Sequence, residues 1–128
     1  MITKIKKAFK NSFLFKQIDK TENKHFQKRL KNTEFTILCP NCIGGLIYHR
    51  LGERFNSPTI DLTINSADFC NFLENIDYYL SQPVIESTPL PNGTPVGIIN
   101  GKESVPDISI FFTHYNTFKQ GVSKWEQR

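Results

Sequence analysis

Residues 35–52 read FTILCPNCIGGLIYHRLG, and they decide the fold class of this 128-residue chain. The run from Phe35 to Cys39 is apolar and β-prone, so it predicts a first core strand. A tight glycine-containing loop over residues 40–45 follows, and the apolar pattern after it predicts a short helix with Gly52 as its C-cap. Strand, glycine loop and helix in this order begin an α/β unit. We therefore expect an α/β fold in which a small mixed sheet is flanked by helices.

Downstream of this unit, the patterns alternate between strand and helix. Residues 59–64 alternate apolar and polar side chains, which predicts a half-buried strand. Ser66 is the expected N-cap of a helix over residues 67–80, which Pro83 ends. The apolar face of that helix comprises Phe69, Phe72, Leu73, Ile76 and Leu80.

The C-terminal third is expected to contain a hairpin and a last helix. Four prolines and an Asn-Gly pair predict a long exposed connection over residues 81–95. Residues 96–100 and 107–112 then read as two paired strands. A polar helix follows over residues 117–128, with Phe118, Val122 and Trp125 recurring at spacings of four and three.

Upstream, the chain is strongly basic. Residues 1–33 hold ten Lys and Arg against Asp19 and Glu22, a net charge of +8, whereas residues 34–128 carry −4. We expect a basic amphipathic N-terminal helix over residues 1–19 and a short second helix over 21–30. The domain organisation follows: a basic helical arm over residues 1–33 and a single α/β domain over residues 34–128. The arm is either a solvated helical face or a surface for acidic lipid, nucleic acid or an acidic partner.

Composition and cysteine usage point to the cytoplasm. Hydrophobic residues make up 38% of the chain and charged residues 22%, which is typical of one globular domain. No apolar run approaches the roughly 20 residues of a membrane span, and we expect no signal peptide. Three cysteines without a disulfide pattern fit a reducing compartment. We predict a cytoplasmic protein, with a peripheral location at the inner membrane face as the alternative.

Together, motifs in order from residue 34 to the end resemble family nineteen-nineteen of the domains of unknown function. These motifs are Phe35-Thr-Ile, Asn41-Cys-Ile-Gly-Gly45, Ile47-Tyr48, Leu51-Gly52, Asn56-Ser-Pro-Thr59, Asp68-Phe69, Phe72-Leu73, Tyr78-Tyr79-Leu80, Pro95-Val-Gly97, His114-Tyr115 and Lys124-Trp-Glu. The family is bacterial, and its members are often labelled exopolysaccharide biosynthesis proteins. The resemblance implies an α/β fold of two similar subdomains without an established activity.

This chain departs from the family pattern at two points. Cys39-Pro40 stands where the family typically has Ser-Asn, which puts polar contacts from those positions in doubt. Family members also usually continue beyond the Lys124-Trp-Glu helix into a second half, so the chain resembles the N-terminal half only. Apolar surface left by a missing half could drive self-association into a homo-oligomer.

Cys39 and Cys42 form a C-x-x-C pair, but no second ligand pair has zinc-site spacing, so we predict no metal site. Cys42 alone is a candidate nucleophile because backbone N–H groups at a helix start lower a thiol pKa. His49 or His114 would be its base if the fold brings either close. The alternative is that Cys42 is a buried packing residue.

The remaining candidate ligand-binding residues surround this loop and the last strand. Gly44 and Gly45 either let an anionic group approach the backbone or allow close packing of helix against strand. His114 follows the last strand, where open α/β sheets present binding groups, and it is our first choice for an acid–base histidine. A polar cleft around it would also contain Asn41, Tyr48, Ser57, Asp61 and Tyr115.

Two functions follow as hypotheses. The first is group transfer on a sugar-nucleotide or glycolipid intermediate of surface-polysaccharide synthesis, which rests on the family label. The alternative is a non-catalytic adaptor or truncated relic, which contacts the inner membrane face through residues 1–20 or binds a polysaccharide-assembly partner. The arm lacks the aromatic platform of nucleic-acid binders, so nucleic acid is the least favoured partner. The sequence identifies no cofactor.

Overall fold

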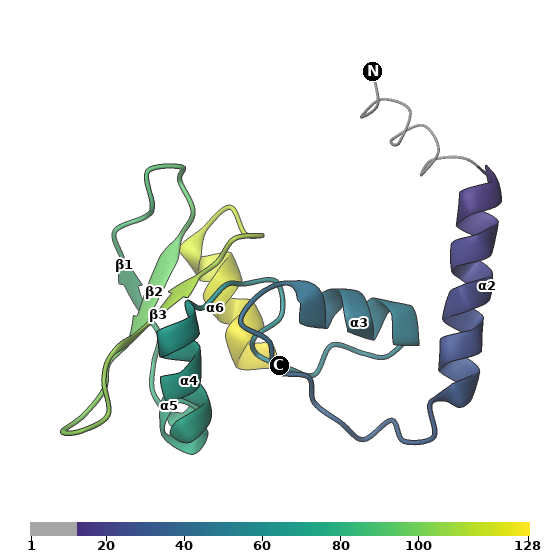
Figure 1. Cartoon of the computed structure of the whole chain (residues 1–128). Coiled ribbons are helices and arrows are strands. Elements are labelled where there is room, and N and C mark those ends of the chain that lie inside the picture. Colours follow the sequence, from purple (N-terminus) through teal and green to yellow (C-terminus); the bar gives the residue numbers. More distant parts are fainter. Residues whose placement is uncertain (1–12) are drawn as a thin grey trace. The chain divides into compact units, whose positions relative to one another are not determined.

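The computed structural model describes residues 13–128. In chain order its elements are α2 (Phe13–Arg29), α3 (Ile43–Leu51), α4 (Ser66–Glu74), α5 (Ile76–Ser81), β1 (Ile85–Ser87), β2 (Val96–Ile99), β3 (Ile108–Phe111) and α6 (Phe118–Gln127) (Figure 1). The described chain divides into two compact units, residues 13–35 with 46–54 and residues 36–45 with 55–128. This content of helices with a small sheet confirms the predicted α/β class.

In the first unit, α2 is one continuous helix through residue 29, so the predicted break after Asp19 is wrong. No Gly or Pro interrupts residues 13–29, and the Thr21 hydroxyl donates back to the carbonyl of Gln17 within the same helix. The part of the amphipathic prediction that concerns residues 1–12 lies outside the described residues. Gln27 donates to the carbonyl of Arg50 (3.4 Å), which joins α2 to α3.

The predicted end of α3 is confirmed. Gly52 has φ of +72°, its N–H donates to the carbonyl of His49 (3.2 Å), and the next N–H, of Glu53, donates to Tyr48 (3.1 Å). This pair of bonds is the Schellman motif, which favours glycine because its central residue is left-handed. Tyr48 itself is buried, and its ring stacks on Phe35 at 5.9 Å.

The second unit contains a three-stranded sheet in the order β1-β2-β3. The predicted hairpin is confirmed: β2 pairs with β3 so that Val96 lies opposite Phe111 and Ile99 opposite Ile108. Both pairings are antiparallel, so the described sheet lacks the parallel pair that a mixed sheet contains. α4 packs along β3 and α6 along β2 (Figure 1).

An aromatic and aliphatic core fills the space between sheet and helices. Phe72 of α4 is fully buried, and its ring lies 5.9 Å from Trp125 of α6 and 6.2 Å from Tyr79 of α5. The other buried members are Leu62, Ile64, Ile99, Ile108, Ile110 and Phe112. α6 lies close to the sheet because its Gly121 faces the Phe112 ring, and a β-carbon at this position would collide with that ring.

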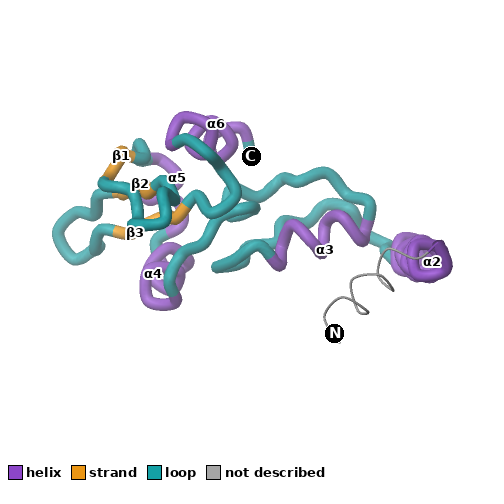
Figure 2. The backbone as a smooth tube through the Cα atoms, turned by 90° about the horizontal axis from the view of Figure 1, so that it is seen from above, coloured by secondary structure: helices purple, strands orange, loops and turns teal. Residues whose placement is uncertain are grey.

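Two predicted strands are absent. Residues 30–42 form a loop (Figure 2), and the N–H of Cys39 donates to the side-chain oxygen of Thr59 (3.1 Å) rather than to a strand. Residues 58–61 form a turn in which Asp61 has φ of +62°, which ends any extended run. Thr63 alone continues the sheet, through one bridge to Phe111 with both N–H to carbonyl distances 2.8 Å.

The predicted helix over residues 67–80 is two helices, and its N-cap is Asn65 rather than Ser66. The Asn65 side chain accepts from the N–H of Asp68 (2.9 Å). Asn75 ends α4 because its side-chain amide also bonds the carbonyl of Asn71 (3.2 Å). After this break Tyr79 is buried, whereas the predicted core residues Leu73 and Leu80 are exposed.

The predicted connection over residues 81–95 contains β1, which no pattern in the sequence indicated. Prolines flank it at residues 83 and 89, but residues 85–87 keep their N–H groups and pair with β2. The final helix is confirmed, with Thr117 as N-cap accepting from Gln120 N–H (3.3 Å).

Candidate functional site

The candidate site of the second unit is built on the turn at residues 57–61. Ser57 and Thr59 are buried, and their hydroxyl oxygens lie 3.2 Å apart. Thr59 also accepts from Cys39 N–H (3.1 Å), so both hydroxyls serve to fix the turn. Asp61 follows in the left-handed region, with 35% of its side chain exposed. The turn therefore presents one carboxylate from a rigid, strained backbone.

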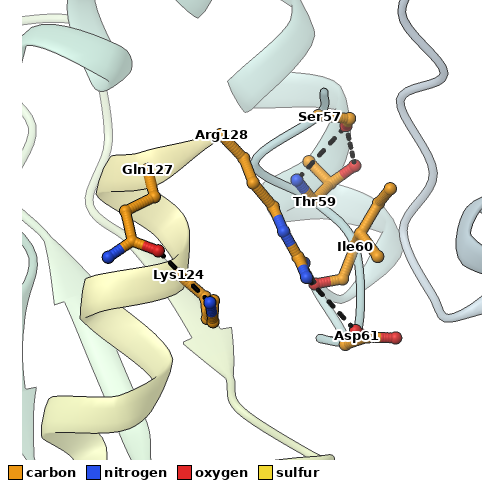
Figure 3. Close-up of polar contacts among 7 residues, drawn as sticks. All are labelled: Ser57, Thr59, Ile60, Asp61, Lys124, Gln127 and Arg128. Carbon is orange, nitrogen blue, oxygen red and sulfur yellow. Dashed lines mark hydrogen bonds and ion pairs between the residues drawn. The ribbon is translucent and has the colours of Figure 1, made fainter. Parts of the chain in front are cut away.

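Arg128 reaches this turn from the end of α6 (Figure 3). Its guanidinium donates to the carbonyl of Ile60 (3.1 Å) and lies 3.5 Å from the Asp61 carboxylate. It also lies over the Phe55 ring, 5.3 Å from the centroid, and only 13% of the side chain is exposed. Five N–H donors and a fixed fork make guanidinium the usual partner of bound phosphate or carboxylate, and these contacts hold it in one place.

Arg128, Asp61 and the residues of its turn form a polar cluster, which Tyr115 completes. Burial raises the pKa of Tyr115 above its usual value, and the Asp61 carboxylate adds to the rise. The Arg128 guanidinium acts in the opposite direction, through its charge and a hydrogen bond to the hydroxyl. Because the net pKa shift is upward, the Tyr115 hydroxyl stays protonated at neutral pH and can donate a hydrogen bond.

Arg128 lines a groove of about 520 Å³. The wall consists of Pro58, Leu80, Ser81, Gln82, Pro83, Val84, Trp125 and Glu126. It combines apolar surface with a few hydrogen-bonding groups, and its volume lies in the range of small-molecule sites, about 300–1,000 Å³. Tyr115 lines a second hollow of about 600 Å³, together with Thr117, Lys119, Gln120, Ser123 and Lys124.

Comparison with known proteins assigns the chain to a family. Residues 12–128 match the family described as "Domain of unknown function (DUF1919)". The chain belongs to this family. A similar protein, described as uncharacterized, occurs in Haemophilus influenzae; it is 35% identical over 106 residues, which cover 83% of this chain and 48% of the relative. The chain thus spans about half the length of the curated relative that it matches.

In this DUF1919 chain, four of the predicted ligand-binding residues come together: Ser57, Asp61 and Tyr115 belong to the cluster, and Gly45 lies against it. A β-carbon on Gly45 would lie 3.2 Å from Ile60 and 3.4 Å from the Asp61 carboxylate. Gly44 packs in the same way on Cys39. Both glycines are buried in packing contacts, which favours the packing alternative for this pair.

The other predicted residues lie apart from this cluster. Asn41 caps the start of α3 by accepting from Ile43 N–H (3.0 Å). Tyr48 stacks on Phe35 in the first unit. His114 is exposed, and within residues 13–128 it makes no hydrogen bond or ion pair. Cys42 is half-buried, and no described hydrogen bond joins it to His49 or His114.

Arg128 and Phe55 belong to the cluster although no sequence pattern indicated them. Arg128 is one of sixteen Lys and Arg residues, and its partner Ile60 lies 68 residues away, so no local pattern distinguishes it. Across residues 13–128, no three His, Cys, Asp or Glu side chains gather closely enough to hold a metal ion. No helix among the described residues is long and apolar enough to cross a membrane.

Proposed function

We propose that this DUF1919 chain acts in bacterial surface-polysaccharide synthesis, where it binds a sugar-nucleotide or glycolipid intermediate for group transfer. The observation that carries the proposal is the Arg128 groove. Arg128 offers a held guanidinium, while Ser81, Gln82 and Glu126 supply hydrogen-bonding side chains and the prolines an apolar wall. An anionic group joined to a polyhydroxylated ring needs this combination. The pathway is supported by the family resemblance alone.

The cluster also contains groups suited to transfer. Arg128 would hold the anionic leaving group, and its charge would stabilise the negative charge that develops there. Asp61, at the edge of the cluster, would accept the proton of the attacking hydroxyl as the new bond forms. Tyr115, which stays protonated, lines the second hollow and would donate a hydrogen bond to a part of the substrate that extends beyond the Arg128 groove. In this proposal Asp61 takes the acid–base role that the sequence analysis gives to His114.

A thermal-shift screen tests the proposal. The purified chain is melted with nucleotide sugars, simple nucleotides and divalent metal ions, because a ligand that binds the native state raises the melting temperature by mass action. We expect a shift with a nucleotide sugar that is lost in Arg128→Gln and kept in Arg54→Gln, an exposed arginine outside the groove. A cooperative melt that no ligand moves would count against this function.

The second candidate is the non-catalytic adaptor at the inner membrane face. Its support is that α2 exposes Ile18 and Phe26 among basic side chains, since apolar and basic groups together favour anionic bilayers. Co-sedimentation of the full chain with phosphatidylglycerol vesicles tests it. The adaptor reading predicts that Ile18→Ser with Phe26→Ser releases the chain, and equal binding by this variant would exclude membrane contact through these two residues.

A further inference from the structure

The Arg128 groove contains a second charged side chain, the carboxylate of Glu126. Glu126 is exposed in the last turn of α6, and Arg128 is the C-cap of the same helix. The Arg128 charge is already matched by Asp61, 3.5 Å away, whereas within residues 13–128 Glu126 forms no ion pair. The unmatched charge of the groove lining is therefore negative, although the groove also presents a guanidinium.

The other polar side chains of the groove wall bond to the protein itself. The Ser81 hydroxyl donates to the carbonyl of Tyr78 (2.6 Å) and accepts from the side-chain amide of Gln82 (3.0 Å). Arg128 has five N–H groups, more than its bonds within the protein use. The groove thus offers a ligand guanidinium donors and, at Glu126, a carboxylate acceptor.

Glu126 sets a condition on any ligand that fills the groove. An exposed carboxylate is hydrated, so a ligand that displaces this water must replace its hydrogen bonds or lose affinity. Sugar hydroxyl groups can do so, because each carries one donor, and a charged acceptor strengthens the bond. An ionised carboxylate of the ligand at this position has no donor and is repelled by the Glu126 charge.

We propose that Glu126 makes the groove selective for an uncharged, hydroxylated sugar joined to phosphate and excludes acidic sugars such as uronic acids. The phosphate binds the Arg128 guanidinium, and a hydroxyl of the sugar donates to the Glu126 carboxylate. This inference rests on the function proposed for the groove and names its substrate class. The selected ring is the transferred sugar rather than a ribose, because sugar nucleotides and sugar-phosphate lipids have only that sugar and its phosphate in common.

Two ligands that differ in one group test the proposal. UDP-glucuronate carries a carboxylate where UDP-glucose carries a hydroxymethyl group, and each is titrated into the ¹⁵N-labelled full chain. The indole N–H signal of Trp125, which lines the groove, reports binding. We expect UDP-glucose to bind about fivefold more tightly than UDP-glucuronate at low salt.

Glu126→Gln removes the charge and keeps the shape of the side chain. UDP-glucose should bind this variant about twofold more weakly, because an amide oxygen is a weaker acceptor than a carboxylate. UDP-glucuronate should bind it more tightly, so the preference for UDP-glucose should fall below about twofold. Glu86→Gln is the matched control, since Glu86 is an exposed residue of β1 outside the groove lining, and it should keep the preference. Circular dichroism verifies that both variants keep the fold.

The failure of this inference differs from the failure of the function on which it rests. If neither ligand moves the indole signal, the function proposed for the groove fails, and the selectivity fails with it. If UDP-glucuronate binds as tightly as UDP-glucose or more tightly, Glu126 does not select the sugar, while sugar-nucleotide binding in the groove stands. Equal loss of the preference in Glu126→Gln and Glu86→Gln would attribute it to the overall charge of the chain and would also overturn the proposal.

Discussion

The guanidinium of Arg128 donates a 3.1 Å hydrogen bond to the carbonyl of Ile60, 68 positions earlier in the chain. The contact fastens the end of α6 to the turn that carries Asp61 (Figure 3). Because the same side chain lines the groove, the shape of the turn and the position of the positive charge depend on each other.

Arg128→Lys should therefore lower stability although it preserves the charge. Lysine has no planar fork, so it cannot keep the Ile60 bond, the Asp61 pair and the Phe55 contact together. We expect the free energy of unfolding, measured in urea, to fall by about 1–2 kcal/mol. Arg54→Lys, at an exposed position, should leave it unchanged. Equal urea midpoints for Arg128→Lys and Arg54→Lys would mean that the Arg128 contacts add nothing to the stability of the fold.

Gly121→Ala should destabilise the second unit. The added methyl would overlap the buried Phe112 ring, so α6 would have to move away from β2. Overpacking of this kind lowers stability by about 1–3 kcal/mol, against a helix-propensity gain of about 1 kcal/mol. Lys119→Ala, on the exposed side of the same helix, is the control. A higher melting temperature for Gly121→Ala would show that α6 does not sit against Phe112.

Stability should decrease at alkaline pH through two tyrosines. Burial, followed by nearby Asp68, raises the pKa of Tyr79, and burial raises that of Tyr115. A raised folded-state pKa means that the stabilisation is complete below about pH 10 and is lost as the pH rises through the folded-state values. The Tyr79→Phe/Tyr115→Phe variant should be less stable near pH 8, since Tyr79 loses its 2.6 Å bond to Pro106, yet decline less steeply above about pH 10. If the stability of the variant and of the unaltered chain fell in parallel with rising pH, the alkaline loss of stability would not come from these two tyrosines.

Complementation distinguishes the two candidate acid–base residues. Asp61→Asn keeps a residue that tolerates a left-handed backbone, and His114→Ala changes an exposed side chain. In a bacterium whose own copy is deleted, we expect Asp61→Asn to fail to restore polysaccharide output and His114→Ala to restore it. The reverse pattern would return the role to His114, as the sequence analysis predicts.

Local patterns predicted the elements whose hydrogen bonds are local. The C-cap Gly52, the helix over residues 117–128 and the paired strands on either side of residues 100–107 were all predicted, and the structure contains each of them. The strand predictions at 35–39 and 59–64 failed because apolar β-prone residues are needed in any buried segment. In those two segments the N–H of Cys39 bonds to Thr59 and that of Ile64 to the carbonyl of Pro40, so Thr63 alone pairs with the sheet.

The candidate site was predicted only in part, for a related reason. Asp61 and Tyr115 are recognisable as polar residues beside apolar runs, but their common partner is fixed by tertiary packing alone. Arg128 meets them because Gly121 and Trp125 hold α6 against Phe112 and Phe72. Conversely, Gly44 and Gly45 matched an anion-binding pattern, and the structure shows them in close packing.

The most direct test of the central claim follows the side chain of Trp125. It lines the groove beside Arg128 and is the only tryptophan in the sequence, so its indole N–H gives one isolated NMR signal. Titration with UDP-glucose should move this signal saturably in the unaltered chain and in Arg54→Gln, and leave it in place in Arg128→Gln. An indole signal that stays fixed in the unaltered chain, or moves equally in Arg128→Gln, would contradict sugar-nucleotide binding in the Arg128 groove.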